Sequence, residues 1–306
     1  MQSSDARSFV SPVILAVPPA YRGAAAMILC AVSFAFMAVF IKLSYNSGAS
    51  VGQVVFFRNL FAFALCLPWF LQVGWEGQRT QILGWHLLRA VVGFSAMMLY
   101  FSSFLFKPMS EVISLNFSAP LFTLVGGALI LHERVGPRRV GAALIGFAGV
   151  LLIVRPWSQS IGWTELMPLI AAVVMGMVPL ILRRMSRTES TSVMVWYQSL
   201  IMTLFSLPLV LMMWQEIGWT SWLFMLGCGV VGYVGQMFLA ESLHHGEASE
   251  IMIYDYCRLP IVAVIELALF GVLPSIWVVP GVLLIAASAV YIARREAFLK
   301  REQGQA

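Results

Sequence analysis

Residues 248–273 read "ASEIMIYDYCRLPIVAVIELALFGVL", an apolar run that contains an acid, a base and a proline. The run is long enough to cross a bilayer, since a spanning helix needs about 20 mostly apolar residues. Asp255, Arg258 and Pro260 stand inside it. A charge is costly at that depth, and a proline interrupts helical hydrogen bonding, so the segment predicts a functional break in a span.

The composition of the whole chain also predicts a membrane environment. Of its 306 residues, 60% are hydrophobic and 11% are charged. An ordinary soluble domain is about 45–50% apolar and about 25% charged, so a water-soluble fold could not bury this much apolar surface. The apolar runs are long and do not alternate with period two, which favours helices over barrel strands. The sequence therefore predicts an all-α, multi-pass membrane protein.

Ten apolar segments are candidate transmembrane helices. Each has the length that a span requires, and a charged turn, "HERVGPRR" at 132–139, separates the fourth from the fifth. The predicted spans cover residues 24–43, 52–72, 86–106, 110–131, 138–155, 164–182, 192–214, 220–242, 248–270 and 276–293.

The basic residues predict the orientation of these spans. One side of the membrane collects, in its connections and at the adjoining span ends, Arg7, Arg22, Arg79, Arg89, Arg134, Arg138, Arg139, Arg183, Arg184, Arg187, Arg294, Arg295, Lys300 and Arg301. The other connections hold only Lys42, Lys107 and Arg155, while Arg58 and Arg258 fall within spans. Because cytoplasmic loops collect Lys and Arg, both termini are expected in the cytoplasm. Residues 1–22 and 297–306 are then cytoplasmic tails.

An internal repeat organises the chain. A shift of 140 residues pairs Leu67-Pro68 with Leu207-Pro208, and Pro120 with Pro260. The predicted repeats cover 23–156 and 163–296, with five spans each. Because five is odd, the two repeats must be inverted relative to each other across the membrane. Inverted repeats are typical of alternating-access transporters, which bind substrate near the midplane between the halves.

The chain resembles the drug/metabolite transporter superfamily, and specifically its EamA type. The resemblance is carried by "FFRNL" around Arg58 and by residues 110–156, from "SEVISLNFSAP" to "LLIVRP". It implies two five-helix repeats and a glutamate, Glu133, at the end of the fourth span. The second repeat of the family usually has its own glutamate, where this chain has Val272 and Leu273. The stretches "LRAVVGFSAMMLYFSSF" and "YDYCRLP" look most like bacterial uptake proteins for S-adenosylmethionine or riboflavin.

Polar residues inside the spans define the predicted binding site. Pro120 and Pro260 would break spans four and nine at symmetric places, and irregular backbone at that depth must line a cavity or lie against protein. The substrate-binding candidates are Arg58, Asn116, Gln198, Gln236, Tyr254, Asp255 and Arg258. Glu266 is the candidate for a coupling proton, because a buried carboxylate can carry one.

Other roles for these residues stay open on the sequence alone. Asp255 and Arg258 are spaced i,i+3, so they can contact a ligand or only neutralise each other. Arg58 can contact substrate or pair across the bundle with Asp255 or Glu266. Its mate under the 140-residue shift is Gln198, which is polar but uncharged.

The function predicted is a secondary active transporter for a small polar or zwitterionic metabolite, of the S-adenosylmethionine, riboflavin or amino-acid kind. No nucleotide-binding loop and no metal-spaced Cys/His set is found, so no cofactor, metal or nucleic-acid partner is expected. The location expected is the bacterial cytoplasmic (inner) membrane, with protons as a candidate coupling ion. A monomer suffices, because one chain contains both repeats, and a dimer is compatible. The alternatives are an intramembrane enzyme or a non-transporting scaffold, with a channel as a weaker option.

Overall fold

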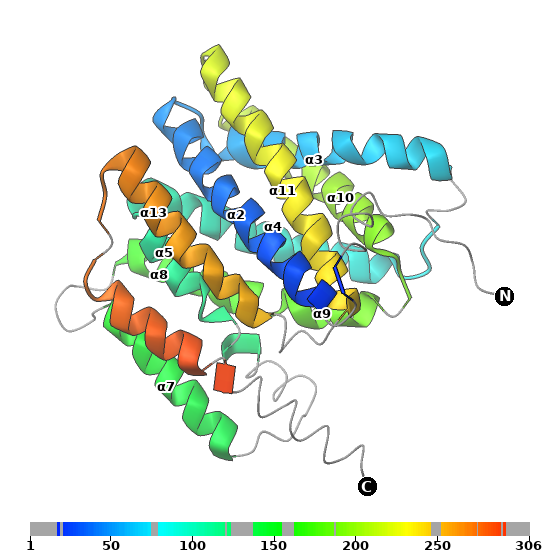
Figure 1. Cartoon of the computed structure of the whole chain (residues 1–306). Helices are drawn as coiled ribbons and strands as arrows, with labels where there is room; N and C mark the ends of the chain where they lie inside the picture. The colour runs from blue at the N-terminus through cyan, green and yellow to red at the C-terminus, as the bar shows by residue number, and fades with distance from the viewer. Residues whose placement is uncertain are drawn as a thin grey trace, which may run out of the picture.

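The computed structural model describes residues 17–18, 21–74, 79–119, 121–123, 137–154, 162–186, 188–245, 252–273, 275–288 and 290–291. This part of the chain is helical throughout and contains no strand (Figure 1). Its elements are α2 (Arg22–Asn46), α3 (Val51–Val73), α4 (Leu83–Phe106), α5 (Met109–Asn116), α7 (Pro137–Val154), α8 (Trp163–Met175), α9 (Val178–Met185), α10 (Thr191–Met212), α11 (Trp219–His245), the 3-10 helix η3 (Met252–Cys257), α13 (Arg258–Phe270) and a last helix over Val278–Ser288.

Five of these helices are long and apolar enough to cross a membrane: α2, α3, α4, α10 and α11. Shorter apolar helices cover Leu144–Ile153, Leu166–Leu182 and Val278–Ser288. The predicted all-helical membrane fold is therefore confirmed. The other predicted spans are shorter or broken within the described residues, as η3 and α13 are over the ninth.

The helices repeat with the shift that the sequence predicts. Moving α3 by 140 residues places it on α10, and α2 falls on α8 and α9 together. Ser50 and Ser190, which the shift also pairs, begin α3 and α10 with extended backbone and accept a hydrogen bond at the third helical residue. The acceptor distances are 3.2 Å from Gln53 N and 3.4 Å from Val193 N. Two equivalent helices thus start with the same side-chain cap, which satisfies an N–H that has no partner inside the helix.

Equivalent helices run antiparallel to each other. At the start of α3, a Cβ added to Gly52 would lie 2.8 Å from the carbonyl oxygen of Leu209, near the end of α10. At the other end of the pair, the rings of Phe70 and Trp196 stack with centroids 4.5 Å apart. Trp196 is therefore packed between helices. The contacts at both ends show that α3 and α10 pass in opposite directions.

The remaining helices also pack in pairs that the repeat makes equivalent. α2 lies along α11 and α13, and these three helices cross Figure 1 side by side. α4 lies along α8. Since the shift relates α2 to α8 and α4 to α11, the α2–α11 and α8–α4 pairs are equivalent contacts in the two halves. The buried core is centred on these pairs and on α3 and α10.

The breaks predicted in spans four and nine differ in detail from the expectation. α5 ends at Asn116, and the helix of span nine changes from 3-10 to α between Cys257 and Arg258. Pro260 is consequently the third residue of α13, in its first turn, where the missing proline N–H leaves no helical bond unmade. The proline begins the second half of the span rather than damaging its middle. Pro120 and Glu133 lie outside the described residues.

α7 and the last helix are packed backbone to backbone at two glycines. A Cβ at Gly149 would lie 2.5 Å from the carbonyl oxygen of Gly281, and one at Gly281 would lie 2.8 Å from that of Gly149. Further along the pair, Ser288 Oγ donates to the carbonyl oxygen of Ala142 at 2.5 Å. Such close approach of two helices in lipid depends on small residues at the contact.

This contact predicts opposite effects for one substitution at two places in α7. Gly149→Ala should lower the unfolding free energy by about 1–3 kcal/mol, because the added methyl overlaps backbone that cannot move aside. Gly141→Ala is the matched control, since a Cβ there meets nothing within 4 Å. It should stabilise the protein by up to about 1 kcal/mol through helix propensity alone. Thermal unfolding in detergent measures both, and equal shifts for the two variants would contradict the packing.

Candidate functional site

Asp255 and Arg258 form a buried ion pair at the break in span nine. Arg258 Nη2 lies 2.6 Å from Asp255 Oδ2, and each residue is 8% exposed. The guanidinium also lies over two rings, 5.9 Å from the centroid of Phe34 and 5.3 Å from that of Phe117. The 3-10 turn of η3 and the start of α13 bring the acid and the base to one side. The pair predicted from their spacing is therefore present.

The ion pair does not satisfy all the polar atoms of its two side chains. Asp255 Oδ1 and Arg258 Nε are buried and have no hydrogen-bond partner among the described residues. Unmade hydrogen bonds of buried charged groups are costly, and in native structures they mark a place for water or a ligand. The pair can thus neutralise itself and still offer one acceptor and one donor to another molecule.

Arg58 is the second buried cation of the interior. It is 3% exposed, and its Nη1 donates to Oδ1 of the neighbouring Asn59 at 2.8 Å. Its Nε has no hydrogen-bond partner within the described residues. The predicted alternative, a pair with Asp255 or Glu266 across the bundle, is not observed, because Asp255 bonds to Arg258 and Glu266 bonds to backbone N–H groups. Arg58 therefore lacks a carboxylate partner in the described part of the chain.

A glycine face on α11 connects these two groups. A Cβ at Gly232 would lie 2.8 Å from Arg58 Nε, so the guanidinium packs directly on the helix backbone. One turn further along α11, a Cβ at Gly235 would lie 2.5 Å from the ring of Phe34, which also lies beneath Arg258. Arg58 and the Phe34–Arg258 contact consequently approach the same face of one helix, about 5 Å apart along its axis.

Gln198 occupies the equivalent position in the other half. The shift relates it to Arg58, and a Cβ at Gly93 of α4 would lie 3.8 Å from Gln198 Nε2. α4 is the counterpart of α11, so each repeat presses one polar side chain of its second helix against a glycine. Gln198 is 9% exposed, and its Oε1 has no hydrogen-bond partner among the described residues. The two repeats thus have a polar side chain at the equivalent position, but only Arg58 is charged.

The remaining predicted site residues lie in different surroundings. Asn116 is 6% exposed at the end of α5, with its Nδ2 free of any hydrogen bond in the described structure. Gln236 is half-buried on α11. Tyr254 is 44% exposed and so does not share the burial of its neighbour Asp255. The structure thus buries Asn116, Gln198 and the charged candidates, and leaves Gln236 and Tyr254 more exposed.

Glu266 is bound to a neighbouring helix. Its Oε1 accepts from Met109 N at 2.6 Å and its Oε2 from Ser110 N at 2.9 Å, while the residue is 2% exposed. Both carboxylate oxygens are therefore used at the first residues of α5. The role of a coupling proton carrier predicted for Glu266 stays a prediction.

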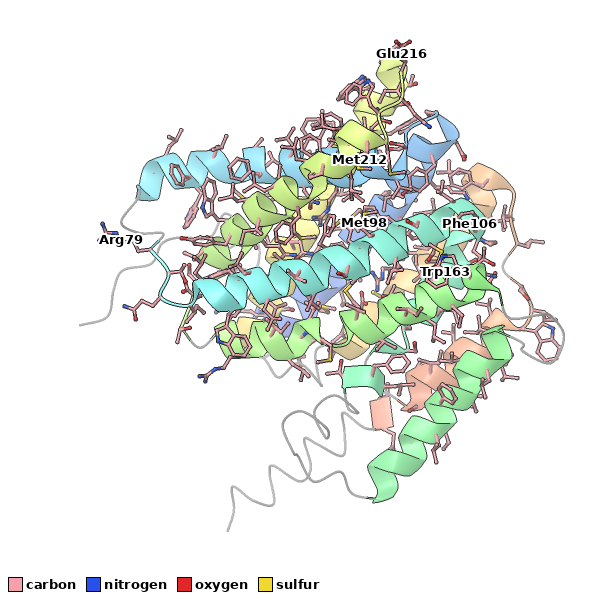
Figure 2. The ribbon with its side chains drawn as sticks, turned by 180° about the vertical axis from the view of Figure 1, so that it is seen from behind. Arg79, Met98, Phe106, Trp163, Met212 and Glu216 are labelled. Carbon is pink, nitrogen blue, oxygen red and sulfur yellow. The ribbon has the colours of Figure 1, made fainter. Side chains whose placement is uncertain are left out.

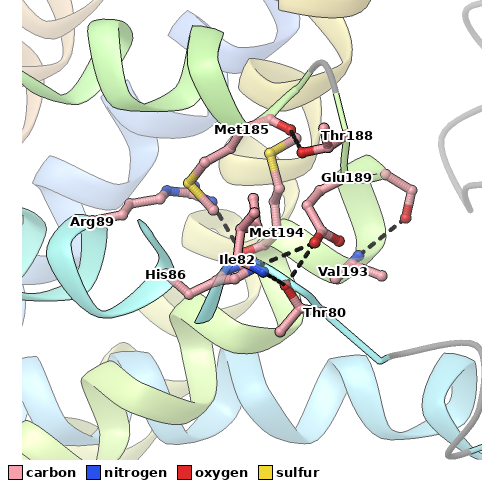
Figure 3. A network of polar contacts seen from close by, with 10 residues as sticks. Thr80, Ile82, His86, Arg89, Met185, Thr188, Glu189, Val193 and Met194 are labelled. Carbon is pink, nitrogen blue, oxygen red and sulfur yellow. Dashed lines mark hydrogen bonds and ion pairs between the residues drawn. The ribbon is translucent and has the colours of Figure 1, made fainter. Parts of the chain in front are cut away.

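A second polar cluster was missed by the sequence analysis. Thr80 Oγ1 donates to Glu189 Oε1 at 2.6 Å, and His86 Nε2 lies 4.0 Å from the same oxygen (Figure 3). Arg89 Nη1 donates to the carbonyl oxygen of Met194 at 3.0 Å. The cluster joins the start of α4 to the α9–α10 connection, that is, the first repeat to the second.

The burial of this cluster corrects one assignment. Arg89 was counted with the basic residues of the connections, yet it and His86 are each 1% exposed within α4. Their i,i+3 spacing, which puts both on one helix face, was the available signal. Residue counts near span ends cannot separate a snorkelling arginine from one turned inward between helices.

The buried polar groups of the interior are of kinds that recognise ligands. Among the described residues, no group of three or more His, Cys, Asp or Glu could hold a metal ion. Buried guanidinium groups, amides and rings bind charge, hydrogen-bonding edges and flat surfaces.

Residues 21–155 and 162–294 each match the EamA-like transporter family. A "Riboflavin transporter" of Vibrio cholerae is 31% identical over 89% of this chain and 91% of its own. An "S-adenosylmethionine uptake transporter" of Rickettsia prowazekii is 24% identical over 80% of this chain and 83% of its own. A "Pseudopaline exporter" of Pseudomonas aeruginosa is 26% identical over 87% of this chain and 94% of its own.

A solved crystal structure matches the fold. It aligns with 89% of this chain and 98% of its own, with a TM-score of 0.62 and 19% sequence identity. At that identity the likeness shows the arrangement of helices alone.

The Asp255–Arg258 pair predicts a pattern in a double-mutant cycle. Asp255→Asn or Arg258→Gln alone should lower the unfolding free energy by about 3 kcal/mol, because each leaves an unpaired buried charge. The double variant Asp255→Asn/Arg258→Gln should lie within about 1 kcal/mol of the parent protein, since both charges are gone. Reversible unfolding in mixed micelles measures the four proteins. Additive losses in the double variant would contradict the pairing.

Proposed function

Because the chain belongs to the EamA-like transporter family, we propose that it is a secondary active transporter that moves a flat, uncharged or anionic ring metabolite across the bacterial cytoplasmic membrane. It is a multi-pass membrane protein of a family of small-metabolite transporters, not an enzyme. The proposal adds the architecture, the site and the substrate class. One observation carries it: Arg58, a buried cation without a carboxylate partner in the described part of the chain.

The architecture proposed is ten spans in two inverted five-helix repeats, with both termini in the cytoplasm. The antiparallel course of α3 and α10 supports the inversion. The connections also sort to two ends. Ser221 Oγ donates to the carbonyl oxygen of Ser47 at 2.8 Å, which joins the α2–α3 connection to the start of α11 at one end. Thr80 and Glu189 join the α3–α4 and α9–α10 connections at the other.

The side-chain view agrees with this sorting. In Figure 2, Arg79 lies at one end of the bundle, while Phe106, Trp163 and Glu216 lie toward the other. Arg79 belongs to the side that collects most of the basic residues of the connections, which is the cytoplasmic side by the positive-inside rule. Alternating access would then open the interior groups first to one end and next to the other.

The substrate site proposed comprises the predicted residues Arg58, Asn116, Gln198, Gln236, Tyr254, Asp255 and Arg258. Five of these residues have a buried polar atom without a hydrogen-bond partner in the described structure: Arg58, Asn116, Gln198, Asp255 and Arg258. The rings of Phe34 and Phe117 lie beside the ion pair. This combination suits a ligand that has a flat ring with hydrogen-bonding edges.

Charge separates the two substrate classes named for the relatives. Arg258 is neutralised by Asp255, whereas Arg58 has no carboxylate partner among the described residues, so the charge next to Arg58 is positive. S-adenosylmethionine is a sulfonium cation, and a like charge in a medium of low dielectric repels it. Riboflavin is neutral and offers an imide edge to a guanidinium. A flavin-like substrate is therefore preferred over S-adenosylmethionine.

Uptake into proteoliposomes tests the function. Riboflavin, S-adenosylmethionine and a set of amino acids are offered with and without a pH gradient, in both directions. Saturable movement of riboflavin is expected, and movement of S-adenosylmethionine alone would reverse the charge argument. No transport of any compound would favour the alternative, a non-transporting scaffold.

Substitution of Arg58 tests whether this residue binds the substrate. Arg58→Gln should raise the KM for the transported compound roughly tenfold, the effect of one lost hydrogen bond to a charged group. Arg184→Gln is the matched control, because Arg184 is exposed on α9, and its kinetics should equal those of the parent protein. Unchanged KM in Arg58→Gln would remove Arg58 from the site.

A further inference from the structure

Glu266 stands at the start of a helix that has no cap of its own. α5 covers only Met109–Asn116, and the residue before it, Pro108, makes no side-chain cap. The first N–H groups of any helix lack acceptors inside the helix. Met109 and Ser110 are 0% and 1% exposed, so water does not replace these acceptors and the missing partners must come from elsewhere in the protein.

The carboxylate of Glu266 supplies those partners from the other repeat. Its two oxygens accept from consecutive backbone N–H groups, Met109 N at 2.6 Å and Ser110 N at 2.9 Å. An anion at a helix N-terminus also interacts favourably with the helix dipole. Charge-assisted bonds of this kind are about twice as strong as neutral ones. The contact links residues 156 and 157 positions apart.

The two helices meet again at their opposite ends. Arg258, the first residue of α13, lies over the ring of Phe117, the residue that follows α5. Met109 lies seven residues before Asn116, and Glu266 lies eight residues after Arg258, which correspond to about 10 and 12 Å of helix. α5 and α13 are thus an antiparallel pair in a fixed register. The register brings the end of α5, with Asn116, to the level of Arg258.

We propose that Glu266 is a positioning residue, whose carboxylate locks α5 to α13 in the register that sets Asn116 beside Arg258. The proposal rests on the proposed function, because Asn116 and Arg258 are proposed substrate ligands. It is specific to one half of the chain. Under the 140-residue shift the counterpart of Glu266 is Gly126, which has no side chain to make such a bond.

This role competes with the coupling proton carrier predicted from the sequence. Both oxygens of Glu266 are occupied by N–H donors, so a proton on either oxygen would displace a bond to α5. A carrier would break and remake this contact in every cycle, whereas a positioning residue keeps it. The two roles therefore predict different kinetics for the same variant.

Hydrogen exchange tests the contact without any substrate. In Glu266→Gln the amide group turns an N–H toward one backbone N–H, so exchange at Met109 and Ser110 should quicken about tenfold or more. Glu111→Gln is the matched control, because Glu111 is also in the first turn of α5 but pairs with Lys107 at 2.7 Å. Unchanged exchange in Glu266→Gln would overturn the proposal.

Transport kinetics separate positioning from proton coupling. With positioning, Glu266→Gln raises the KM for substrate exchange and for net uptake together, and net uptake keeps its dependence on the pH gradient. With a proton carrier, exchange at equal pH survives while gradient-driven uptake is lost, and this result would overturn the proposal. If the parent protein transports nothing, the proposed function fails, while hydrogen exchange still decides whether the contact holds α5.

A rescue variant separates the register from simple capping. Pro108 has extended backbone, with φ −56° and ψ 147°, which suits a capping aspartate. Pro108→Asp in the Glu266→Gln background should restore slow exchange at the start of α5 without linking it to α13. The raised KM is expected to persist. Recovery of KM together with slow exchange would overturn the positioning role, since any cap would then suffice.

Discussion

The absence of water around the backbone is the constraint on which this structure depends. An unbroken spanning helix such as α2 or α11 satisfies its own N–H and C=O groups everywhere except at its two ends. A broken span cannot, and every end inside the membrane needs a partner from another element. A buried helix start needs the same help, and at the start of α5, directly after the α4–α5 connection, the partner is the carboxylate of Glu266. That contact holds α5 against α13, and the other ends of these two helices carry Asn116 and Arg258.

Helix position and repeat could be read from the sequence because both rest on local chemistry. The apolar runs set the spans, and predicted and observed bounds of α3 and α10 agree within two residues. The paired prolines and the 140-residue shift predicted a repeat, which appears as equivalent helices with equivalent serine caps. The i,i+3 spacing of Asp255 and Arg258 predicted their ion pair. Each of these depends on neighbours along the chain.

The rest of the site depends on contacts between distant segments, which one sequence does not encode in a local pattern. Glu266 was expected to be a titrating acid, because nothing near it in the sequence shows that α5 begins beside it. Arg89 was assigned to a membrane face by its distance from the span end, and only the fold shows it turned toward Met194. The contact of Arg58 with Gly232 likewise needs α3 and α11 to be packed first. Tyr254 lies in the 3-10 helix η3, and its 44% exposure was not apparent from the sequence.

The unequal pairing of the two halves has a consequence for the resting state. Two identical inverted repeats would make the inward-open and outward-open forms mirror each other, with equal free energies and equal populations. This chain departs from that balance at three pairs of positions related by the 140-residue shift. The pairs are Arg58 and Gln198, Gly126 and Glu266, and Ala49 and Glu189. In the proposed alternating-access cycle, each departure would give one form a contact that the other does not repeat. A few polar substitutions would then set the preferred orientation of the empty carrier, since a difference of about 1.4 kcal/mol between two forms makes one of them tenfold more populated.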